Sequence, residues 1–152
     1  MINKTINYKN NQIEFHSLYE SGHNIDGNII NNSLYKRTDH TFDNFLKKLE
    51  KGSIIYDIGA YIGTFSIPLS LEGMKVYSFE GFPDNYDRLN KNCEPYDIQT
   101  HLIALSNENK KVVTKFNDCT AQSAQEREIT YTIFEEYLES ISIESPDFIK
   151  MD

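Results

Sequence analysis

The stretch SIIYDIGAYIGTF, residues 53–65, decides the fold of this chain. Residues 54–56 are β-branched or aromatic and show no polar alternation, a pattern typical of a strand that is covered on both faces in a parallel sheet. Gly59 and Gly63 follow, and because they carry no Cβ they permit a sharp turn and the close approach of a ligand. We therefore predict a buried strand, a tight turn, and then a helix over residues 62–72.

An acid stands at the start of this turn. Asp57, Gly59 and Gly63 form the pattern D-x-G-x-x-x-G. A dinucleotide-binding turn reads G-x-G-x-x-G and places a pyrophosphate at a helix N-terminus. The carboxylate of Asp57 would repel phosphate, so it suits a cationic ligand instead, such as the ammonium group of S-adenosylmethionine.

A second acid, Glu80, follows the strand predicted at residues 75–79 and lies 23 residues after Asp57. An acid at about this distance from a glycine turn accepts hydrogen bonds from the ribose hydroxyls in nucleotide-binding folds. Together the two acids favour an adenosine-type ligand. The alternative is that Asp57 and Glu80 only cap helices at the ends of two ordinary strands.

Composition narrows the classes of partner. The chain has 152 residues, a net charge of −8 and a pI near 5.0, which fits a single domain. Its Lys and Arg residues are dispersed, so nucleic acid is not an expected partner. The chain shows neither a signal peptide nor a membrane span, so we expect a cytoplasmic protein that does not bind membranes.

The cysteines and histidines do not have the spacing of a metal or redox site. We predict free thiols at Cys93 and Cys119. Surface positions are expected for His16, His23 and His40.

Residues 1–50 are expected to form a hairpin and helical section, and residues 51–152 a cofactor-binding half-sheet of the same domain. The elements predicted for the first section are a hairpin over 5–16 that turns at Asn10 and Asn11, a helix over 26–36, and a helix over 42–49 between an N-cap at Thr41 and a stop at Gly52. The aromatic stripe of Phe42 and Phe45 is interpreted as core.

Strands and helices alternate through the second section. The later elements that we predict are a helix from Pro83 to Cys93, a strand over 98–105, its hairpin partner over 110–116, a loop over 118–127, a helix over 133–140 capped by Thr132, and a buried strand over 148–151 with Asp152 at its tip. This order predicts an α/β fold, a doubly wound half-sheet with right-handed crossovers.

Five stretches, in this order and spacing, resemble the FkbM-type family of S-adenosylmethionine-dependent methyltransferases. They read YDIGAYIGTFSI, VYSFEGFPDNYDRLNKNC, HLIALSNENKKV, ITYTIFEEYL and DFIKMD. The resemblance covers residues 53–152. It implies a Rossmann-like class I sheet with strand order 3-2-1-4, S-adenosylmethionine as the cofactor, and methylation of a hydroxyl group on a sugar or another small molecule.

The glycine turn follows the family's D-x-G-A-N-x-G pattern at most positions. The residues that match the family in the turn and after the second strand are Asp57, Gly59, Ala60, Gly63 and Glu80. Tyr61 stands where the family commonly has Asn, and Gly81 replaces the proline of its E-P pair. We expect the cofactor's ammonium group at Asp57, the turn backbone along the ligand, and the ribose at Glu80.

Of the family's I-K-x-D-x-E-G sequence, the first four positions are present as residues 149–152. Asp152 is the base that we name for the acceptor hydroxyl, and the alternative is a solvated acid without a catalytic role. The family's sheet has seven strands and only four are expected here. We therefore expect a fragment, an early-terminated reading frame, or one part of a split or oligomeric protein. Its bare fourth-strand edge would permit self-association, and its cofactor binding would be weak because the ligand crevice is incomplete.

Two other functions stay open from the residues. One is a nucleotide- or NAD-binding domain of the ordinary Rossmann type, which predicts tighter binding of NAD than of S-adenosylhomocysteine. The other is a non-catalytic interaction module or truncated remnant, which predicts no ligand binding.

Overall fold

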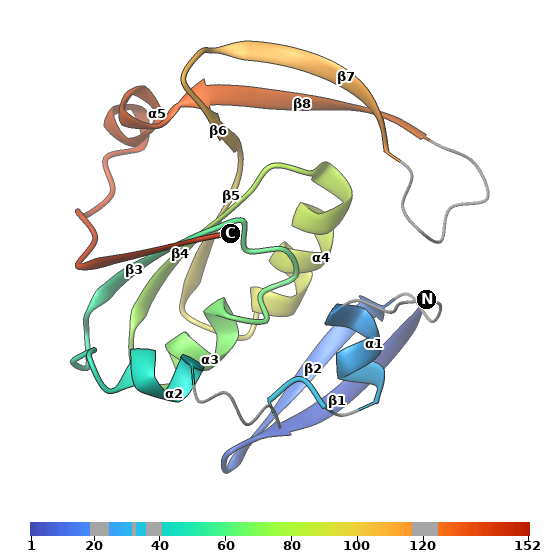
Figure 1. Cartoon of the computed structure of the whole chain (residues 1–152), viewed down its shortest axis with the longest axis vertical. Coiled ribbons are helices and arrows are strands. Elements are labelled where there is room, and N and C mark those ends of the chain that lie inside the picture. The colour runs from blue at the N-terminus through green and yellow to red at the C-terminus, as the bar shows by residue number, and fades with distance from the viewer. Residues whose placement is uncertain (19–24, 32, 36–40, 117–124) are drawn as a thin grey trace.

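The computed structural model describes residues 1–18, 25–31, 33–35, 41–116 and 125–152. Its principal sheet is parallel and has the order β5-β4-β3-β9 (Figure 1). The strands are β3 (Ile54–Ile58), β4 (Lys75–Glu80), β5 (Ile98–Leu102) and β9 (Phe148–Met151). Along the chain this order is 3-2-1-4, so the predicted α/β half-sheet is confirmed.

Apolar layers cover both faces of this sheet. On one face, Ile55 belongs to a cluster with Leu69 of α3 and with Met74. On the other face, Tyr56 packs in a cluster that Phe134 of α5 joins. The helices are α2 (Thr41–Leu46), α3 (Ser66–Leu71), α4 (Pro83–Cys93) and α5 (Phe134–Ile141). Burial on both sides explains the lack of polar alternation in β3.

The fourth strand is more exposed than predicted. β9 pairs with β3 in parallel register, and Ile149 lies opposite Tyr56. However, Ile149 is 51% exposed and Met151 is 70% exposed. The place of this strand in the sheet is confirmed, but the prediction of a buried strand is wrong, because among the described residues β3 is its one strand neighbour.

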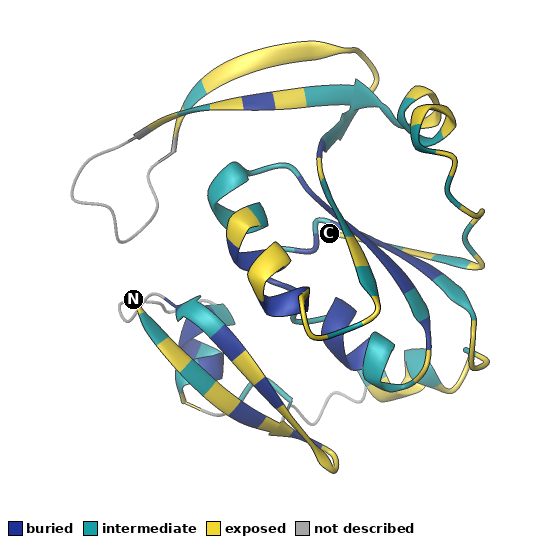
Figure 2. Cartoon of the chain, turned by 180° about the vertical axis from the view of Figure 1, so that it is seen from behind, coloured by how far each residue is buried: buried dark blue, intermediate teal, exposed yellow. Residues whose placement is uncertain are grey.

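The N-terminal section forms a hairpin of β1 (Ile2–Tyr8) and β2 (Asn11–Leu18), followed by α1 (Ile25–Ile30). Buried and exposed residues alternate along both strands (Figure 2). The hairpin is confirmed, but its turn lies one residue earlier than predicted, because Tyr8 pairs with Asn11 and Lys9 has a φ of 50°. The backbone N–H of His16 donates to Asn92 Oδ1 at 2.8 Å, so this section packs against α4.

Three helices are shorter than predicted. α3 begins at Ser66 because Tyr61 and Gly63 have φ values of 55° and 90°, which a helix does not tolerate. Pro68 is the third residue of α3 and lies in its first turn, where proline is tolerated. The kink expected at Pro68 stays a prediction. α1 ends at Ile30 and α2 at Leu46, where the chain changes to turns. Gly52 therefore lies beyond the end of α2.

The helix that starts at Pro83 and ends at Cys93 is confirmed. α5 is also present, but its N-cap is Ile133 without a side-chain hydrogen bond. Thr132 is instead a strand residue. The predicted cap at Thr132 is therefore wrong, and the cap at Thr41 involves a side chain outside the described part.

A second sheet has the order β6-β8-β7, with β6 (Ala104–Ser106), β7 (Lys110–Phe116) and β8 (Gln125–Ile133). The predicted strand over 98–105 is divided at Ile103, whose N–H donates to the carbonyl oxygen of Glu80 at 2.9 Å. The predicted hairpin between this strand and residues 110–116 is wrong, since β7 pairs antiparallel with β8. Residues 125–127, predicted as loop, belong to β8, and residues 118–124 lie outside the described part.

Other local predictions have mixed outcomes. Cys93 is a buried free thiol, and burial raises its pKa to about 12. His16 is half-buried rather than a surface residue. Predictions for Cys119, His23 and His40 fall outside the described residues. Within the described ranges, no helix combines the length and apolarity needed to cross a membrane.

Candidate functional site

The glycine turn is held against the end of β4. The backbone N–H groups of Gly59 and Ala60 donate to the carbonyl oxygen of Phe79, at 2.9 and 3.0 Å. Gly59 has a φ of 75°, which lets the chain reverse directly after β3. Ala60 is buried, and Tyr61 packs against a core cluster that includes Phe15 of β2, Ile29 of α1 and Leu89 of α4. The turn thus lies at the carboxyl ends of two adjacent parallel strands.

Glu80 joins this turn to the segment after β4. Its Oε2 accepts a hydrogen bond from the N–H of Tyr61, and its Oε1 accepts one from the N–H of Phe82, each at 2.9 Å. Only 5% of Glu80 is exposed. Burial raises the pKa of Glu80, and the two backbone donors oppose that rise. The Glu80 carboxylate thus holds the backbone of the glycine turn and the backbone of the segment that follows β4.

Asp57 is completely buried beneath the turn. The hydroxyl of Ser66 donates to Asp57 Oδ2 at 2.5 Å, and Lys150 Nζ lies 3.0 Å from Asp57 Oδ1. Lys150 and Asp57 thus form an ion pair. Burial raises the pKa of Asp57, whereas Lys150 and Ser66 lower it. Asp57 therefore already has a cation beside it.

Lys150 connects two of the three predicted acids, Asp57 and Asp152. Besides Asp57, its Nζ lies 3.3 Å from the carbonyl oxygen of Gly59 and 3.4 Å from Asp152 Oδ2. The side chain of Asp152 is 78% exposed, whereas that of Lys150 is 21% exposed. The structure thus brings Asp57, Gly59 and Asp152 together around one ammonium group. Sequence reasoning noted Lys150 as part of a family motif and missed this role, which the parallel register of Asp57 with Lys150 reveals.

Gly63 has a packing requirement of its own. A Cβ at this residue would lie 3.1 Å from Cys93 Sγ and 3.3 Å from the Cδ1 atoms of Ile67 and Leu89. Gly63 therefore allows the turn to contact α4 closely. The expected contact of Gly63 with a ligand stays a prediction.

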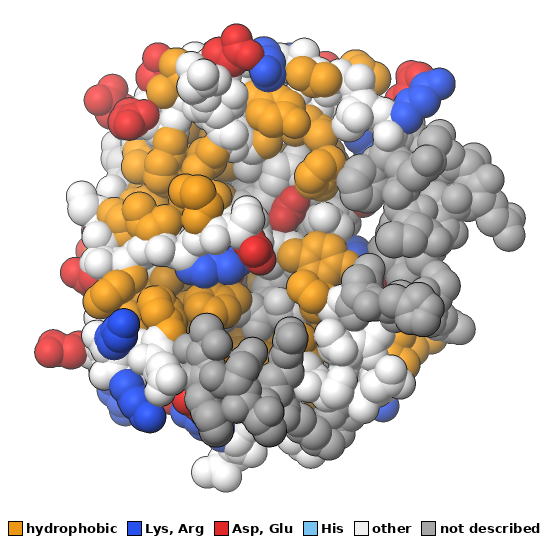
Figure 3. Space-filling model, in the orientation of Figure 1, with side chains coloured by type: hydrophobic (Ala, Val, Ile, Leu, Met, Phe, Trp, Pro, Cys, Tyr) orange, Lys and Arg blue, Asp and Glu red, His pale blue; other side chains and the backbone are white. Residues whose placement is uncertain are grey.

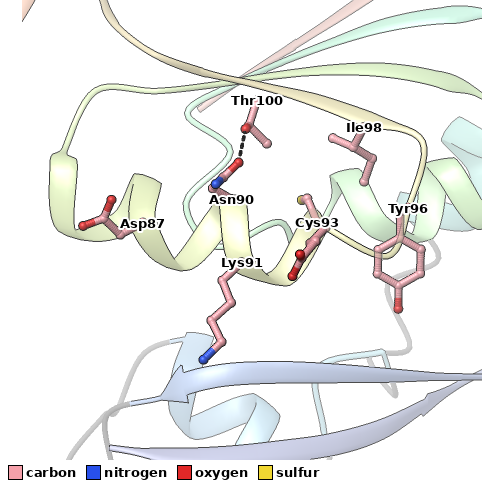
Figure 4. A pocket seen from close by; sticks show the side chains of 8 residues that line it. Asp87, Asn90, Lys91, Cys93, Tyr96, Ile98 and Thr100 are labelled. Carbon is pink, nitrogen blue, oxygen red and sulfur yellow. Dashed lines mark hydrogen bonds between the residues drawn. The ribbon is translucent and has the colours of Figure 1, made fainter.

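A cavity of about 330 Å³ lies along α4 and β5 (Figure 4). Its polar wall includes Asn90, whose Oδ1 accepts a hydrogen bond from Thr100 Oγ1 at 2.8 Å. A second hollow, of about 480 Å³, adjoins β7, β8 and α5. The described residues that line these two hollows include none of the predicted site residues, so neither marks the cofactor site.

The described part of the chain contains no group of three or more His, Cys, Asp or Glu residues placed to hold a metal ion. The candidate site consists of Asp57, the glycine turn, Glu80 and Lys150, which the contacts described above bring together.

Comparison with known proteins finds local similarity. No protein-family model matches the chain. A segment of 65 residues is 31% identical to the tRNA (guanine(37)-N(1))-methyltransferase of Anopheles gambiae, and 61 residues are 31% identical to the protein of the same name from Aedes aegypti. These segments cover 43% and 40% of this chain. The chain spans 11% of the length of each relative.

Solved structures give partial alignments. TYW2 of P. horikoshii, in complex with MeSAdo, is 23% identical and aligns over 38% of this chain and 24% of its own, with a TM-score of 0.34. A SAM-dependent methyltransferase from Agrobacterium tumefaciens is 10% identical and aligns over 64% of this chain and 31% of its own, with a TM-score of 0.43. The chain is thus similar over part of its length to proteins that include methyltransferases.

Proposed function

We propose that this chain forms the cofactor-binding part of an S-adenosylmethionine-dependent methyltransferase. The observation that carries the proposal is the pair of buried acids, Asp57 and Glu80, at the carboxyl ends of adjacent strands and on either side of a left-handed glycine turn. Ligands of open α/β sheets bind outside the carboxyl ends of the strands. The local identity with two curated methyltransferases supports the same activity.

The residues at the turn fit the separate parts of this cofactor. Glu80 would accept hydrogen bonds from the ribose hydroxyls, and the backbone of the turn would lie along the ligand. The ammonium group would be placed at Asp57, whose Oδ1 already has Lys150 Nζ as an ion partner at 3.0 Å. That contact requires Lys150 to withdraw from Asp57, and Asp152 is already its second partner at 3.4 Å. When bound, the cofactor supplies a methyl group activated by a sulfonium sulfur.

The acceptor that we propose is a hydroxyl group of a sugar or another small molecule. Asp152 would take the proton of that hydroxyl, because its carboxylate is exposed and close to the turn. The curated relatives are named for tRNA, but a net charge of −8 disfavours a polyanionic acceptor for this chain. Substitution Asp152→Asn is expected to slow methyl transfer by roughly 10²-fold or more, and an unchanged rate removes Asp152 from the mechanism.

We also propose that the exposed edge of β9 supports self-association. Hydrophobic side chains gather on the face that carries β9 (Figure 3), and Ile149 and Met151 are exposed there. An unpaired strand edge offers backbone donors and acceptors to another strand. Size-exclusion chromatography should show an oligomer that Met151→Lys shifts toward monomer. A monomeric wild-type protein would contradict this part of the proposal.

Calorimetric titration with S-adenosylhomocysteine tests the cofactor site directly. Asp57→Ala and Glu80→Ala should each weaken binding by roughly 1.5–3 kcal/mol, the usual worth of a hydrogen bond to a charged group. Glu108→Ala is the control, since it removes an exposed acid that pairs with Lys110 at the surface. Tighter binding of NAD would favour an ordinary Rossmann domain, and no binding of either ligand would favour a non-catalytic module.

A further inference from the structure

A buried polar cluster connects the N-terminal section to the glycine turn. Asp26 of α1 is fully buried, and Arg88 of α4 is 5% exposed. Arg88 Nη2 lies 2.5 Å from Asp26 Oδ2. The hydroxyl of Tyr61 donates to Asp26 Oδ1 at 2.8 Å, and Arg88 Nη1 donates to the same hydroxyl at 3.3 Å. The guanidinium carbon of Arg88 is 5.2 Å from the centre of the Tyr61 ring.

Such a cluster is a poor source of stability. Removing two charges from water costs several kcal/mol per ion, and an apolar pair of equal volume is often at least as stable. Three mutually bonded groups nevertheless fix one orientation of each partner, because an alternative orientation would leave a buried charge unpaired. The cluster of Asp26, Arg88 and Tyr61 is therefore suited to holding the Tyr61 ring in one place.

The backbone of Tyr61 shows what this orientation controls. Tyr61 has a φ of 55°, which is unfavourable for a bulky residue. In this conformation its N–H donates to Glu80 Oε2 at 2.9 Å. The side chain of Tyr61 thus contacts the N-terminal section while its amide contacts the acid that we assign to the ribose.

We infer that Asp26 and Arg88 are positioning residues of the cofactor site that act through Tyr61. They hold the Tyr61 ring, and the ring holds the strained backbone whose N–H orients the Glu80 carboxylate. The N-terminal section is then an integral support of the site. This inference rests on the proposed function, because it assigns Glu80 to a ligand.

The test uses Tyr61→Phe, which removes one hydroxyl and keeps the ring. The matched control is Tyr8→Phe, because the hydroxyl of Tyr8 also joins the N-terminal hairpin to the rest of the chain. It donates to Glu72 Oε1, at the end of α3, at 2.9 Å and does not contact the Tyr61–Glu80 pair. Tyr61→Phe should speed hydrogen exchange of the residue-61 amide and weaken S-adenosylhomocysteine binding by roughly three- to tenfold. Tyr8→Phe should change neither.

A second variant tests the ion pair. Asp26→Asn combined with Arg88→Met removes both charges together, and it should speed exchange at residue 61 in the same way as Tyr61→Phe. Wild-type exchange and affinity in Tyr61→Phe would overturn the inference, whether or not the double variant folds. If the wild-type protein binds no S-adenosylhomocysteine, the proposed function fails, and exchange at residue 61 alone decides the role of the cluster.

Discussion

Substituting Gly63 by Ala tests why a glycine is needed in the turn. A Cβ at the φ of 90° observed for Gly63 strains the backbone by about 1–2 kcal/mol. That Cβ also meets three side-chain atoms of α3 and α4 at 3.1–3.3 Å. Overpacking of this kind costs about 1–3 kcal/mol. Gly63→Ala is therefore expected to lower the free energy of unfolding by roughly 2–5 kcal/mol.

Gly52→Ala provides the matched control. Gly52 has a φ of 88°, almost the same as Gly63, but its added Cβ would have no atom within 4 Å. The strain is thus shared by the two variants and the packing cost is not. The free energy of unfolding of Gly63→Ala should lie below that of Gly52→Ala by about 1–3 kcal/mol.

Urea unfolding followed by far-UV circular dichroism measures this difference. The m-values of both variants should match that of the wild type, so that a change in midpoint reports stability. Equal destabilisation by the two substitutions would refute the packing argument. If Gly63→Ala has the stability of Gly52→Ala but loses affinity for S-adenosylhomocysteine, the glycine serves the ligand instead of the helix contact.

Two further predictions follow from buried charges. Lys150→Met should lower the free energy of unfolding by about 1–3 kcal/mol at pH 7, because it leaves the Asp57 carboxylate without its cation. The loss should shrink as the pH falls and Asp57, whose pKa burial raises, takes up a proton. A loss independent of pH in urea unfolding would contradict the pairing. Burial lowers the pKa of His101, so the folded protein should lose stability as the pH falls below about 6.5, where the unfolded chain binds a proton. His101→Phe should reduce the fall in melting temperature between pH 7 and pH 5. Loss of the contact with Tyr137 should lower the melting temperature by the same amount at each pH. If the melting temperatures of the variant and the wild type change equally with pH, His101 is excluded as the cause.

Local sequence patterns predicted the parts of the fold that depend on near neighbours. The apolar run of β3 and the Pro83 start of α4 both occur where expected. The order of the four parallel strands was also predicted, because a family resemblance supplied it. The second sheet was not predicted, since β8 is a polar, alternating strand in which Ile129 is buried. Its two partners, β6 and β7, both precede it in the sequence, and β8 lies between them in the sheet.

For the acids of the candidate site, too, the local pattern was predictable and the distant partners were not. Their positions at the carboxyl ends of two strands were apparent from the sequence pattern alone. Their surroundings were not, since Asp57 is paired with a lysine 93 residues later in the chain and Glu80 is oriented by Tyr61.

The sequence by itself determined where strands, turns and acids occur, because backbone preference and hydrophobic periodicity act over a few residues. Only the tertiary structure decided which charges meet. Asp26 and Arg88 are 62 residues apart, and no local pattern marks them as partners. Their contact exists because the hairpin section packs against α4, and the free energy of an ion pair depends on the distance and burial that such packing creates.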